Sequence, residues 1–186
     1  MANLTESQVY SYAKDWANVY GPKYGADPTE MARVLTGIAK VESTYNSNAK
    51  NKKSSARGLM QILINTQREI ELKHAKVPYA IAGVRASSFP KAPVGLPDKI
   101  YDPNYAMQIA AAYLGYQYKR YKGDWQKAIH AYNQGSFPGT KKQDGANYLA
   151  KVNNAKSNQS EQVAYIPKNK SVTDKHGNQY VYSVFI

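Results

Sequence analysis

One carboxylate, Glu42, occupies a position that disfavours its charged form. It follows Leu35 and Ile38 by seven and four residues, which places it on the apolar face of a helix predicted to begin after Asp27. It also falls in the last turn of that helix, where the macrodipole favours a cation. Both features raise the pKa of a carboxyl group. A carboxyl that stays protonated near neutral pH suits a general acid acting on a glycosidic oxygen.

An ordinary structural role for Glu42 is the stronger alternative when its position is taken alone. The polar stretch that follows, residues 43–55, predicts a loop, so the helix end can fray and turn Glu42 into solvent. Glu42 can also pair with Lys40 or with a lysine of residues 50–53.

Two later segments place polar side chains next to apolar ones. Gln61 lies within the apolar run 58–62, and residues 131–135 end a helix with Tyr132, Asn133 and a glycine. Buried amides and phenols need hydrogen-bonding partners, and a saccharide, which is dense in hydroxyl groups, supplies them. Each segment alone is more simply explained by packing or by a helix C-terminus.

Taken in order along the chain, these segments resemble the soluble lytic transglycosylase (SLT) domain. This family is glycoside hydrolase family twenty-three of the lysozyme-like superfamily, which it shares with goose-type lysozymes. The resemblance covers residues 28–152 and rests on motifs that are short singly but specific in this order. The motifs are Glu42-Ser43; Ser54-Ser55-Ala56-Arg57-Gly58-Leu59-Met60-Gln61-Ile62 with Thr66; Asp102-Pro103 with Ala112-Tyr113-Leu114; Ala128 and Ala131-Tyr132-Asn133 with Gly135; and Tyr148-Leu149 with Lys151-Val152.

The chain departs from the family pattern at several positions, which affects the expected subsites more than the expected acid. A longer insertion, residues 67–101, precedes the motif at Asp102. The Ser-Ser-Ala-x-Gly-Leu form, residues 54–59, is similar to phage-associated members of the family. The substituted positions are Ser47 in place of a proline, Ser55-Ala56 in place of Gly-Ala, Leu63-Ile64 in place of Met-Pro, and Asp144 in place of a glutamate.

The resemblance implies that Glu42 is the sole catalytic carboxylate of a peptidoglycan lytic transglycosylase. Glu42 would protonate the oxygen between N-acetylmuramic acid and N-acetylglucosamine. It would then act as base on the muramic C6 hydroxyl, which closes a 1,6-anhydro ring. No water enters, so no second carboxylate has to hold one, unlike in two-carboxylate glycosidases. The sequence agrees, because Asp27, Asp102 and Asp124 precede helices and are predicted to be N-caps.

The family pattern also implies a set of substrate-binding residues. Gln61 and Asn133 would hydrogen-bond acetamido or hydroxyl groups, and Tyr132 would orient Glu42 or the sugar. Tyr45 would either stack on a sugar or pack beneath the loop, and packing is favoured. The full set of expected substrate contacts is Tyr45, Ser54, Ser55, Met60, Gln61, Leu63, Tyr132 and Asn133.

The charge and composition limit the partners and cofactors. The 186 residues include 25 Lys and Arg against 13 Asp and Glu, a formal net charge of +12, and the excess is mostly lysine. Lysine attracts a polyanion without base-specific readout, so nucleic acid, an anionic membrane surface and anionic cell-wall polymers are the candidates. The motifs favour the cell envelope, with peptidoglycan glycan strands as substrate and no specific nucleic acid. No cysteine is present, and His74, His130 and His176 lack metal-ligand spacing, so no metal or other cofactor is expected.

The elements that position these residues are predicted to be mainly helical. Capping signals and apolar spacing predict helices that begin at residues 5, 28, 103 and 125, a further helix through Leu72, and another across 147–152. Gly21-Pro22 is predicted to end the first helix, and Glu30 to complete a capping box with Asp27.

These elements predict a mainly α, lysozyme-like α+β fold, similar to goose-type lysozyme. The helical domain is expected over residues 1–157, with residues 67–101 as a long insertion. Alternating residues after 158 predict a short C-terminal β extension, residues 158–186, with a turn at His176-Gly177-Asn178.

The ends of the chain bear on where the protein acts. The N-terminus lacks a basic start followed by an apolar run, so no secretory signal peptide is predicted, and no stretch approaches the roughly 20 apolar residues of a membrane span. With the phage-like motif, this predicts a protein that acts on the host wall or periplasm, either within a virion beside other virion proteins or released at lysis. Three other functions stay open: a goose-type lysozyme that uses water, a virion structural or binding protein without catalysis, and a nucleic-acid-binding module.

Overall fold

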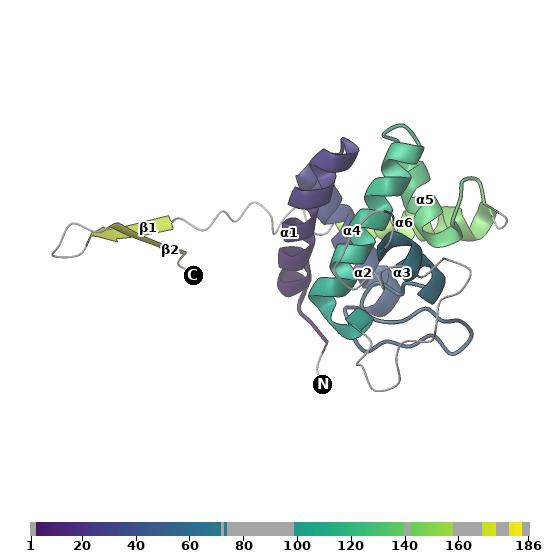
Figure 1. The fold of residues 1–186 in the computed structure, drawn as a ribbon, viewed down its shortest axis with the longest axis horizontal. Helices are drawn as coiled ribbons and strands as arrows, with labels where there is room; N and C mark the ends of the chain where they lie inside the picture. Colours follow the sequence, from purple (N-terminus) through teal and green to yellow (C-terminus); the bar gives the residue numbers. More distant parts are fainter. Residues whose placement is uncertain are drawn as a thin grey trace. The chain divides into compact units, whose positions relative to one another are not determined.

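The computed structural model describes residues 3–71, 73, 99–139, 142–157, 169–173 and 179–183. It divides into two compact units, Met1–Lys156 and Ser157–Ile186. The first unit is built from helices, which confirms the mainly α, lysozyme-like prediction (Figure 1). Its elements are α1 (Glu6–Tyr24), α2 (Pro28–Ser43), α3 (Ile64–Ile70), the short 3-10 helix η3 (Lys99–Tyr101), α4 (Pro103–Arg120), α5 (Trp125–Gln134) and α6 (Lys142–Ser157).

Three aspartates start helices, as the sequence predicts. In each case the backbone N–H of the third helical residue donates to the aspartate side chain. The distance is 2.7 Å for Asp27 in α2 and 3.0 Å for both Asp102 in α4 and Asp124 in α5. At the start of α1, where capping signals predict a helix, Thr5 and Gln8 form a capping box in which each side chain caps the other's backbone N–H. These acids therefore satisfy helix N-termini.

The predicted end of α1 is wrong, because the helix continues through Gly21 and Pro22 to Tyr24. A proline in the last turn removes only one backbone hydrogen bond. The helix instead ends at Gly25, whose φ of 75° is the left-handed conformation that closes many helices. The N–H of Ala26 then donates to the carbonyl of Gly21 at 2.9 Å.

The capping box predicted for α2 is half wrong. Asp27 accepts from the backbone of Glu30, but the Glu30 side chain does not return the bond. It accepts from Lys156 Nζ of α6 at 2.5 Å and lies 3.6 Å from Arg33. A tertiary ion pair has replaced a local cap, and it ties the end of α6 to the start of α2.

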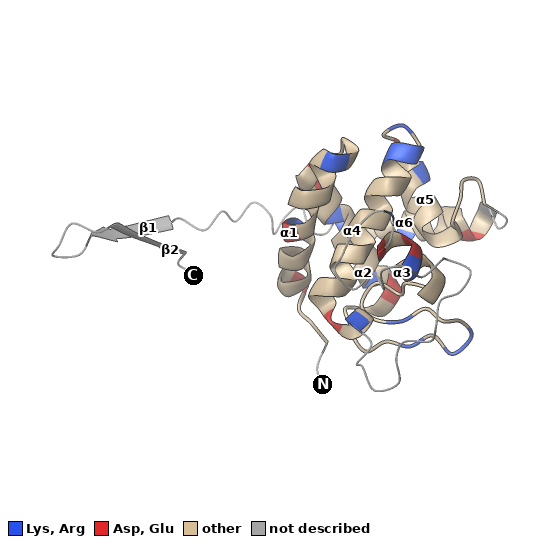
Figure 2. Ribbon diagram, in the orientation of Figure 1, with Lys and Arg blue, Asp and Glu red and all other residues tan. Residues whose placement is uncertain are grey.

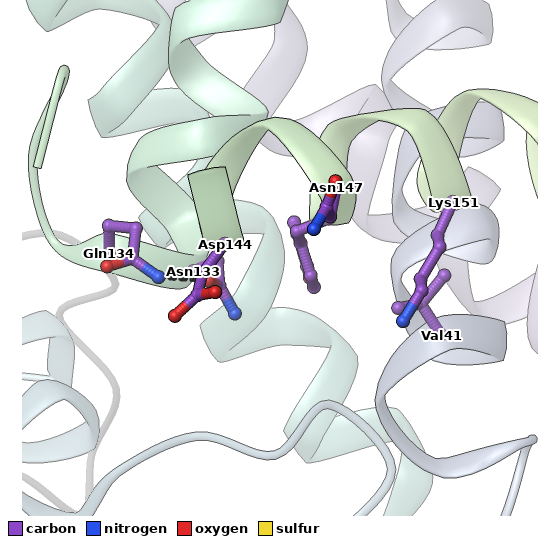
Figure 3. Close-up of a pocket in the computed structure, with 7 residues that line it drawn as sticks. Val41, Asn133, Gln134, Asp144, Asn147 and Lys151 are labelled. Atoms are coloured by element: carbon purple, nitrogen blue, oxygen red, sulfur yellow. Dashed lines mark hydrogen bonds between the residues drawn. The ribbon is translucent and has the colours of Figure 1, made fainter. Parts of the chain in front are cut away.

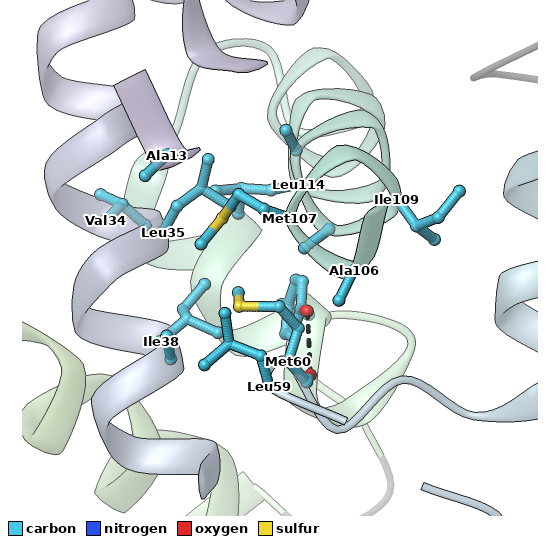
Figure 4. Close-up of a cluster of buried hydrophobic side chains, with 14 of the residues drawn as sticks. Ala13, Val34, Leu35, Ile38, Leu59, Met60, Ala106, Met107, Ile109 and Leu114 are labelled. Carbon is cyan, nitrogen blue, oxygen red and sulfur yellow. Dashed lines mark hydrogen bonds between the residues drawn. The ribbon is translucent and has the colours of Figure 1, made fainter. Parts of the chain in front are cut away.

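The core of this unit lies between α1, α2 and α4 (Figure 4). Leu35 and Ile38 of α2 face Met107 and Leu114 of α4, and all four side chains are fully buried. Burial of each such side chain contributes roughly 1.5–3 kcal/mol. This packing holds α2 rigidly up to its last turn, the turn that carries Glu42.

The loop between α2 and α3 is braced by its own backbone. Arg57 forms isolated antiparallel bridges with Lys50 and with Ile62. Gly58, with φ of 76°, donates its N–H to the carbonyl of Ala49 at 2.8 Å. A side chain at Gly58 would meet the carbonyl oxygen of Ile100 at 2.3 Å, so only glycine permits this approach to η3. The loop is thereby held close to the core.

The second unit contains an antiparallel pair of strands, β1 (Asn169–Thr173) and β2 (Gln179–Ser183). The register pairs Asn169 with Ser183 and Thr173 with Gln179. Strands therefore occur within the segment where alternating residues in the sequence predict them. The predicted turn at residues 176–178 and residues 74–98 of the insertion lie outside the described residues. Within the described part of the chain, no helix is long and apolar enough to cross a membrane.

Candidate active site

Glu42 lies half-buried in the last turn of α2, with its carboxylate held by one phenol. Tyr148 of α6 donates its hydroxyl to Glu42 Oε1 at 2.7 Å. Burial raises the pKa of Glu42 from its ordinary 4.5 to about 7, and the hydrogen bond from Tyr148 opposes that rise. Both protonation states of Glu42 are therefore accessible near neutral pH.

The lysines near Glu42 in the sequence do not neutralise it. Lys40 Nζ lies 4.9 Å from the ring centre of Tyr45, and Lys50 Nζ lies 5.4 Å from the ring centre of Tyr101. Among the described residues, none of the recorded ion pairs includes Glu42. The frayed, solvent-facing and lysine-paired alternatives therefore do not describe Glu42 in this structure.

A second phenol, Tyr132 of α5, lies near Glu42 but binds elsewhere. Its hydroxyl donates to the carbonyl oxygen of Met60 at 3.2 Å, and its ring lies 5.2 Å from that of Tyr113. Burial, with the nearby charge of Glu42, raises the pKa of both Tyr132 and Tyr148 well above the ordinary value. Both phenols thus remain protonated donors across the range in which Glu42 titrates.

A cleft of about 340 Å³ opens beside Glu42, and we call it the Glu42 cleft. It combines the end of α2, the loop before α3, the middle of α4 and the end of α5. Gln61, Leu63, Tyr132 and Asn133, four of the residues expected from the sequence, meet Glu42 here. The remaining lining residues are Asn51, Ala56, Ile62, Thr66, Tyr113, Gln134 and Gly135.

A second hollow of about 500 Å³ adjoins the Glu42 cleft, and we call it the α6 pocket (Figure 3). Asn133 and Gln134 line both hollows. Tyr148 lines the α6 pocket and binds Glu42, which lines the cleft. The acid therefore lies where the two hollows meet. The other lining residues of the α6 pocket are Val41, Asp144, Asn147 and Lys151.

Four of the expected contact residues line neither hollow. Ser54 and Ser55 are exposed and stabilise the loop: Ser54 Oγ accepts from the N–H of Ala56 at 3.2 Å and Ser55 Oγ from that of Ile64 at 3.3 Å. Tyr45 and Met60 are buried in the core. The burial of Tyr45 agrees with the packing role favoured from the sequence.

Gln61 reaches the cleft in a backbone conformation that is uncommon for its residue type, with φ of 47°. Its Nε2 donates to the carbonyls of Gly58 at 3.0 Å and Ala49 at 3.3 Å. These bonds hold the loop and use the amide donors. The described residues give its Oε1 no partner, so the oxygen is the group that Gln61 offers to a ligand.

The sequence places Tyr148 in the last motif of the family resemblance but assigns it no role, although Tyr148 is in direct contact with the acid. The available signal was a phenol on the same helical face as Val152, since a tyrosine on a buried face needs a partner for its hydroxyl. Gly37 favours this contact, because a Cβ there would lie only 3.0 Å from the carbonyl oxygen of Val152. The missing side chain lets α6 approach α2 closely enough for Tyr148 to reach Glu42.

Tyr148→Phe should raise the pKa of Glu42 further, by about one unit. The change removes a donor that favours the carboxylate and leaves the burial in place. A carboxyl-carbon NMR titration of Glu42 would measure the shift. Tyr132→Phe is the matched control, because its hydroxyl donates to Met60 and should move the Glu42 pKa less. A pKa that is unchanged in Tyr148→Phe would contradict the assigned hydrogen bond.

Glu42→Gln should stabilise the protein at pH 8 but not at pH 4. A folded-state pKa above the unfolded value means that the folded state binds the proton more tightly, so wild-type stability falls as pH rises from 4.5 to about 7. The variant lacks this penalty, which is at most about 3 kcal/mol. Urea unfolding at both pH values would measure the difference. Glu6→Gln, at a partly exposed residue in the first turn of α1, should show no such pH-dependent gain, and an equal gain in both variants would refute burial as the cause.

The described residues contain no group of three or more His, Asp or Glu placed to hold a metal ion.

A search of curated proteins found no match to the chain. A family model described as the transglycosylase SLT domain matches residues 20–159, a span that runs from the end of α1 past α6 and includes Glu42 and the described linings of both hollows. That family comprises lysozyme-like lytic transglycosylases that act on peptidoglycan. The chain belongs to the transglycosylase SLT domain family.

Proposed function

We propose that this protein is a lytic transglycosylase that cleaves the β-1,4 bond between N-acetylmuramic acid and N-acetylglucosamine and leaves a 1,6-anhydro end. The observation that carries the proposal is the Glu42 carboxyl, whose burial at the meeting point of two hollows raises its pKa to about 7. A group with this pKa is an efficient donor and acceptor of protons at neutral pH.

In the first step Glu42 donates its proton to the glycosidic oxygen. The bond between that oxygen and C1 of the muramic residue breaks, and the glucosamine end leaves as an alcohol. Glu42 is now a carboxylate. It accepts the proton of the muramic C6 hydroxyl while that oxygen attacks C1, which closes the anhydro ring and returns Glu42 to its acid form. Tyr148 stabilises the carboxylate between the steps through its 2.7 Å hydrogen bond.

A single carboxylate is sufficient for this sequence, because the nucleophile belongs to the substrate. Among the described residues that line the Glu42 cleft, Glu42 is the one acid. A glycosidase that activates water usually places a second carboxylate across the bond. The composition of the cleft therefore favours the intramolecular reaction.

The substrate is held by groups that match a saccharide. Gln61 Oε1 accepts from a sugar hydroxyl or acetamido N–H, and the exposed Asn133 supplies both a donor and an acceptor at the boundary of the two hollows. Tyr132 supports the wall of the cleft through Met60, and Leu63, 45% exposed, offers an apolar surface. Ser54, Ser55, Met60 and Tyr45 act through the loop and the core.

Glu42→Gln should lower the rate of peptidoglycan cleavage by about a thousandfold while the protein stays folded, because general acid–base catalysis contributes on the order of 10²–10⁴. A zymogram of wild type, Glu42→Gln and the control Glu6→Gln on α1 would measure the loss. Mass analysis of the wild-type products would then identify the reaction, since anhydro ends are lighter than reducing ends by one water.

Each other outcome assigns a different function. Reducing ends in place of anhydro ends would identify a hydrolytic muramidase. Full activity of Glu42→Gln would remove this residue from the chemistry. Tight, salt-sensitive binding to duplex DNA, without activity on the cell wall, would indicate a nucleic-acid-binding module.

We also propose that lysines near the Glu42 cleft attract anionic polymers of the cell envelope. Lys50, Lys52 and Lys53 are exposed on the loop that contributes Asn51 to the cleft, and Figure 2 shows the basic residues along this loop. Exposed lysines attract a polyanion by charge without ordered contacts. Delivery by a phage particle stays a prediction from the sequence.

High salt should release the protein from intact cell wall without slowing the cleavage of short soluble fragments, because salt screens long-range attraction and leaves the cleft chemistry intact. Co-sedimentation with wall and a fragment assay, each at about 50 and 500 mM salt, would separate the two effects. A charge-reversed variant of Lys52 and Lys53 should reproduce the release at low salt. The same reversal at Lys14 and Lys23, on the distant helix α1, is the control, and equal release by both would point to net charge alone.

A further inference from the structure

The α6 pocket carries opposite charges at its two ends. Asp144 lies beside Asn133 and Gln134, Lys151 lies beside Val41, and Asn147 lies between the two charges (Figure 3). The residues of α6 in this pocket are spaced by three, four and seven positions, so one face of the helix forms the wall. The neutral sugars of the substrate offer no charge to either end.

Both charged side chains are exposed and available to a ligand. Among the residues that the structure describes, neither Asp144 nor Lys151 takes part in an ion pair. Another lysine of the same helix, Lys156, pairs with Glu30 at 2.5 Å. The pocket thus contains two charged side chains that form no ion pair with the described residues. The C-terminal end of the same helix is held by the ion pair of Lys156.

The position of Asp144 is fixed by the next residue. A Cβ at Gly145 would lie 2.2 Å from the ring of His130, so only glycine allows the first turn of α6 to rest on α5. His130 Nε2 donates in turn to the carbonyl of Pro138 at 2.7 Å. The acid is therefore carried on a well-supported turn close to the end of α5.

The spacing of the two charges fits a short peptide. Seven residues of α-helix span about 10.5 Å at 1.5 Å per residue. An extended peptide covers the same length in about three residues. A pocket of about 500 Å³ accommodates a ligand of that size.

We propose that the α6 pocket binds the peptide stem of peptidoglycan, with Asp144 receiving its free ammonium group and Lys151 receiving one of its carboxylates. The identity of the polymer rests on the proposed function. The charges of peptidoglycan lie on these stems, which carry carboxylates and an amine, whereas its amino sugars are N-acetylated. A ligand with both signs of charge satisfies both ends of the pocket at once.

A pocket of this kind would distinguish cross-linked from uncross-linked peptide stems. Cross-linking converts the ammonium group of a stem into an amide, which removes the charge that Asp144 receives. Strands with uncross-linked stems should therefore bind more tightly and be cleaved first.

The test measures binding to the full-length Glu42→Gln protein, so that the ligand is not consumed. The probes are a muropeptide disaccharide with its stem, the same disaccharide without the stem, and two forms of the stem in which the amine is acetylated or the carboxylates are amidated. The stem should tighten binding about tenfold, which corresponds to about 1.4 kcal/mol, and each modification should remove most of that gain. Calorimetry and NMR shifts of the Asn147 side-chain amide would report on the site.

Two variants assign the charges separately. With Asp144→Asn, the protein should no longer distinguish free from acetylated amine but should still distinguish free from amidated carboxylates. Lys151→Met should show the opposite pattern. Asp15→Asn and Lys14→Met on α1 are the matched controls and should distinguish both pairs as the parent does. Unfolding curves would show that the exposed substitutions leave the fold intact.

The outcomes separate this proposal from the proposed function. Equal affinity with and without the stem, or unchanged discrimination in Asp144→Asn and Lys151→Met, would overturn the stem pocket even if the wild type makes anhydro products. Stem-dependent binding that follows the expected pattern, in a wild type that cleaves nothing, would uphold the pocket and overturn the catalytic function.

Discussion

The contact between α6 and the last turns of α2 is the constraint on which the site depends. Gly37 lets the helices approach, and the pair of Lys156 with Glu30 holds the far end of α6 against the start of α2. Beyond Gly37, near the end of α2, Tyr148 reaches Glu42 across 106 residues of sequence. The same approach buries the carboxyl and provides its hydrogen-bond donor. Burial alone would raise the pKa further, so the value of about 7 reflects two opposed effects of one packing contact.

That balance connects stability with the proposed chemistry. Keeping a buried carboxyl ionised above its raised pKa lowers the free energy of unfolding. Glu42 lowers the stability of the folded protein in this way. The large core between α1, α2 and α4 supplies the stability that such a residue requires. Asp27, Asp102 and Asp124 illustrate the contrast, because each is an acid used as an ordinary helix cap. Environment, not residue type, distinguishes Glu42 from them.

Features governed by neighbours in the sequence were predicted well, and features governed by distant contacts were not. The helix starts at Asp27, Asp102 and Asp124 follow from side chains within three residues of the N–H groups they cap, and the structure confirms them. Glu30 departs from its expected local role because a lysine 126 residues away competes for its carboxylate. The helix that continues past Pro22 shows that a proline in a last turn is a weak stop when a glycine three residues later ends the helix better.

The sequence by itself determined the apolar face that Glu42 occupies, the mainly helical fold and the family, because each depends on residue types at short, regular spacings. Only the tertiary structure decided which groups surround the acid. It placed Tyr148 on Glu42, directed the amide donors of Gln61 into the loop, and kept Tyr45, Ser54, Ser55 and Met60 off the lining of the two hollows. It also brought Asp144 and Lys151 into one pocket. Such placements depend on how closely two helices approach, and that distance is set by glycines and ion pairs whose partners lie far apart in the chain.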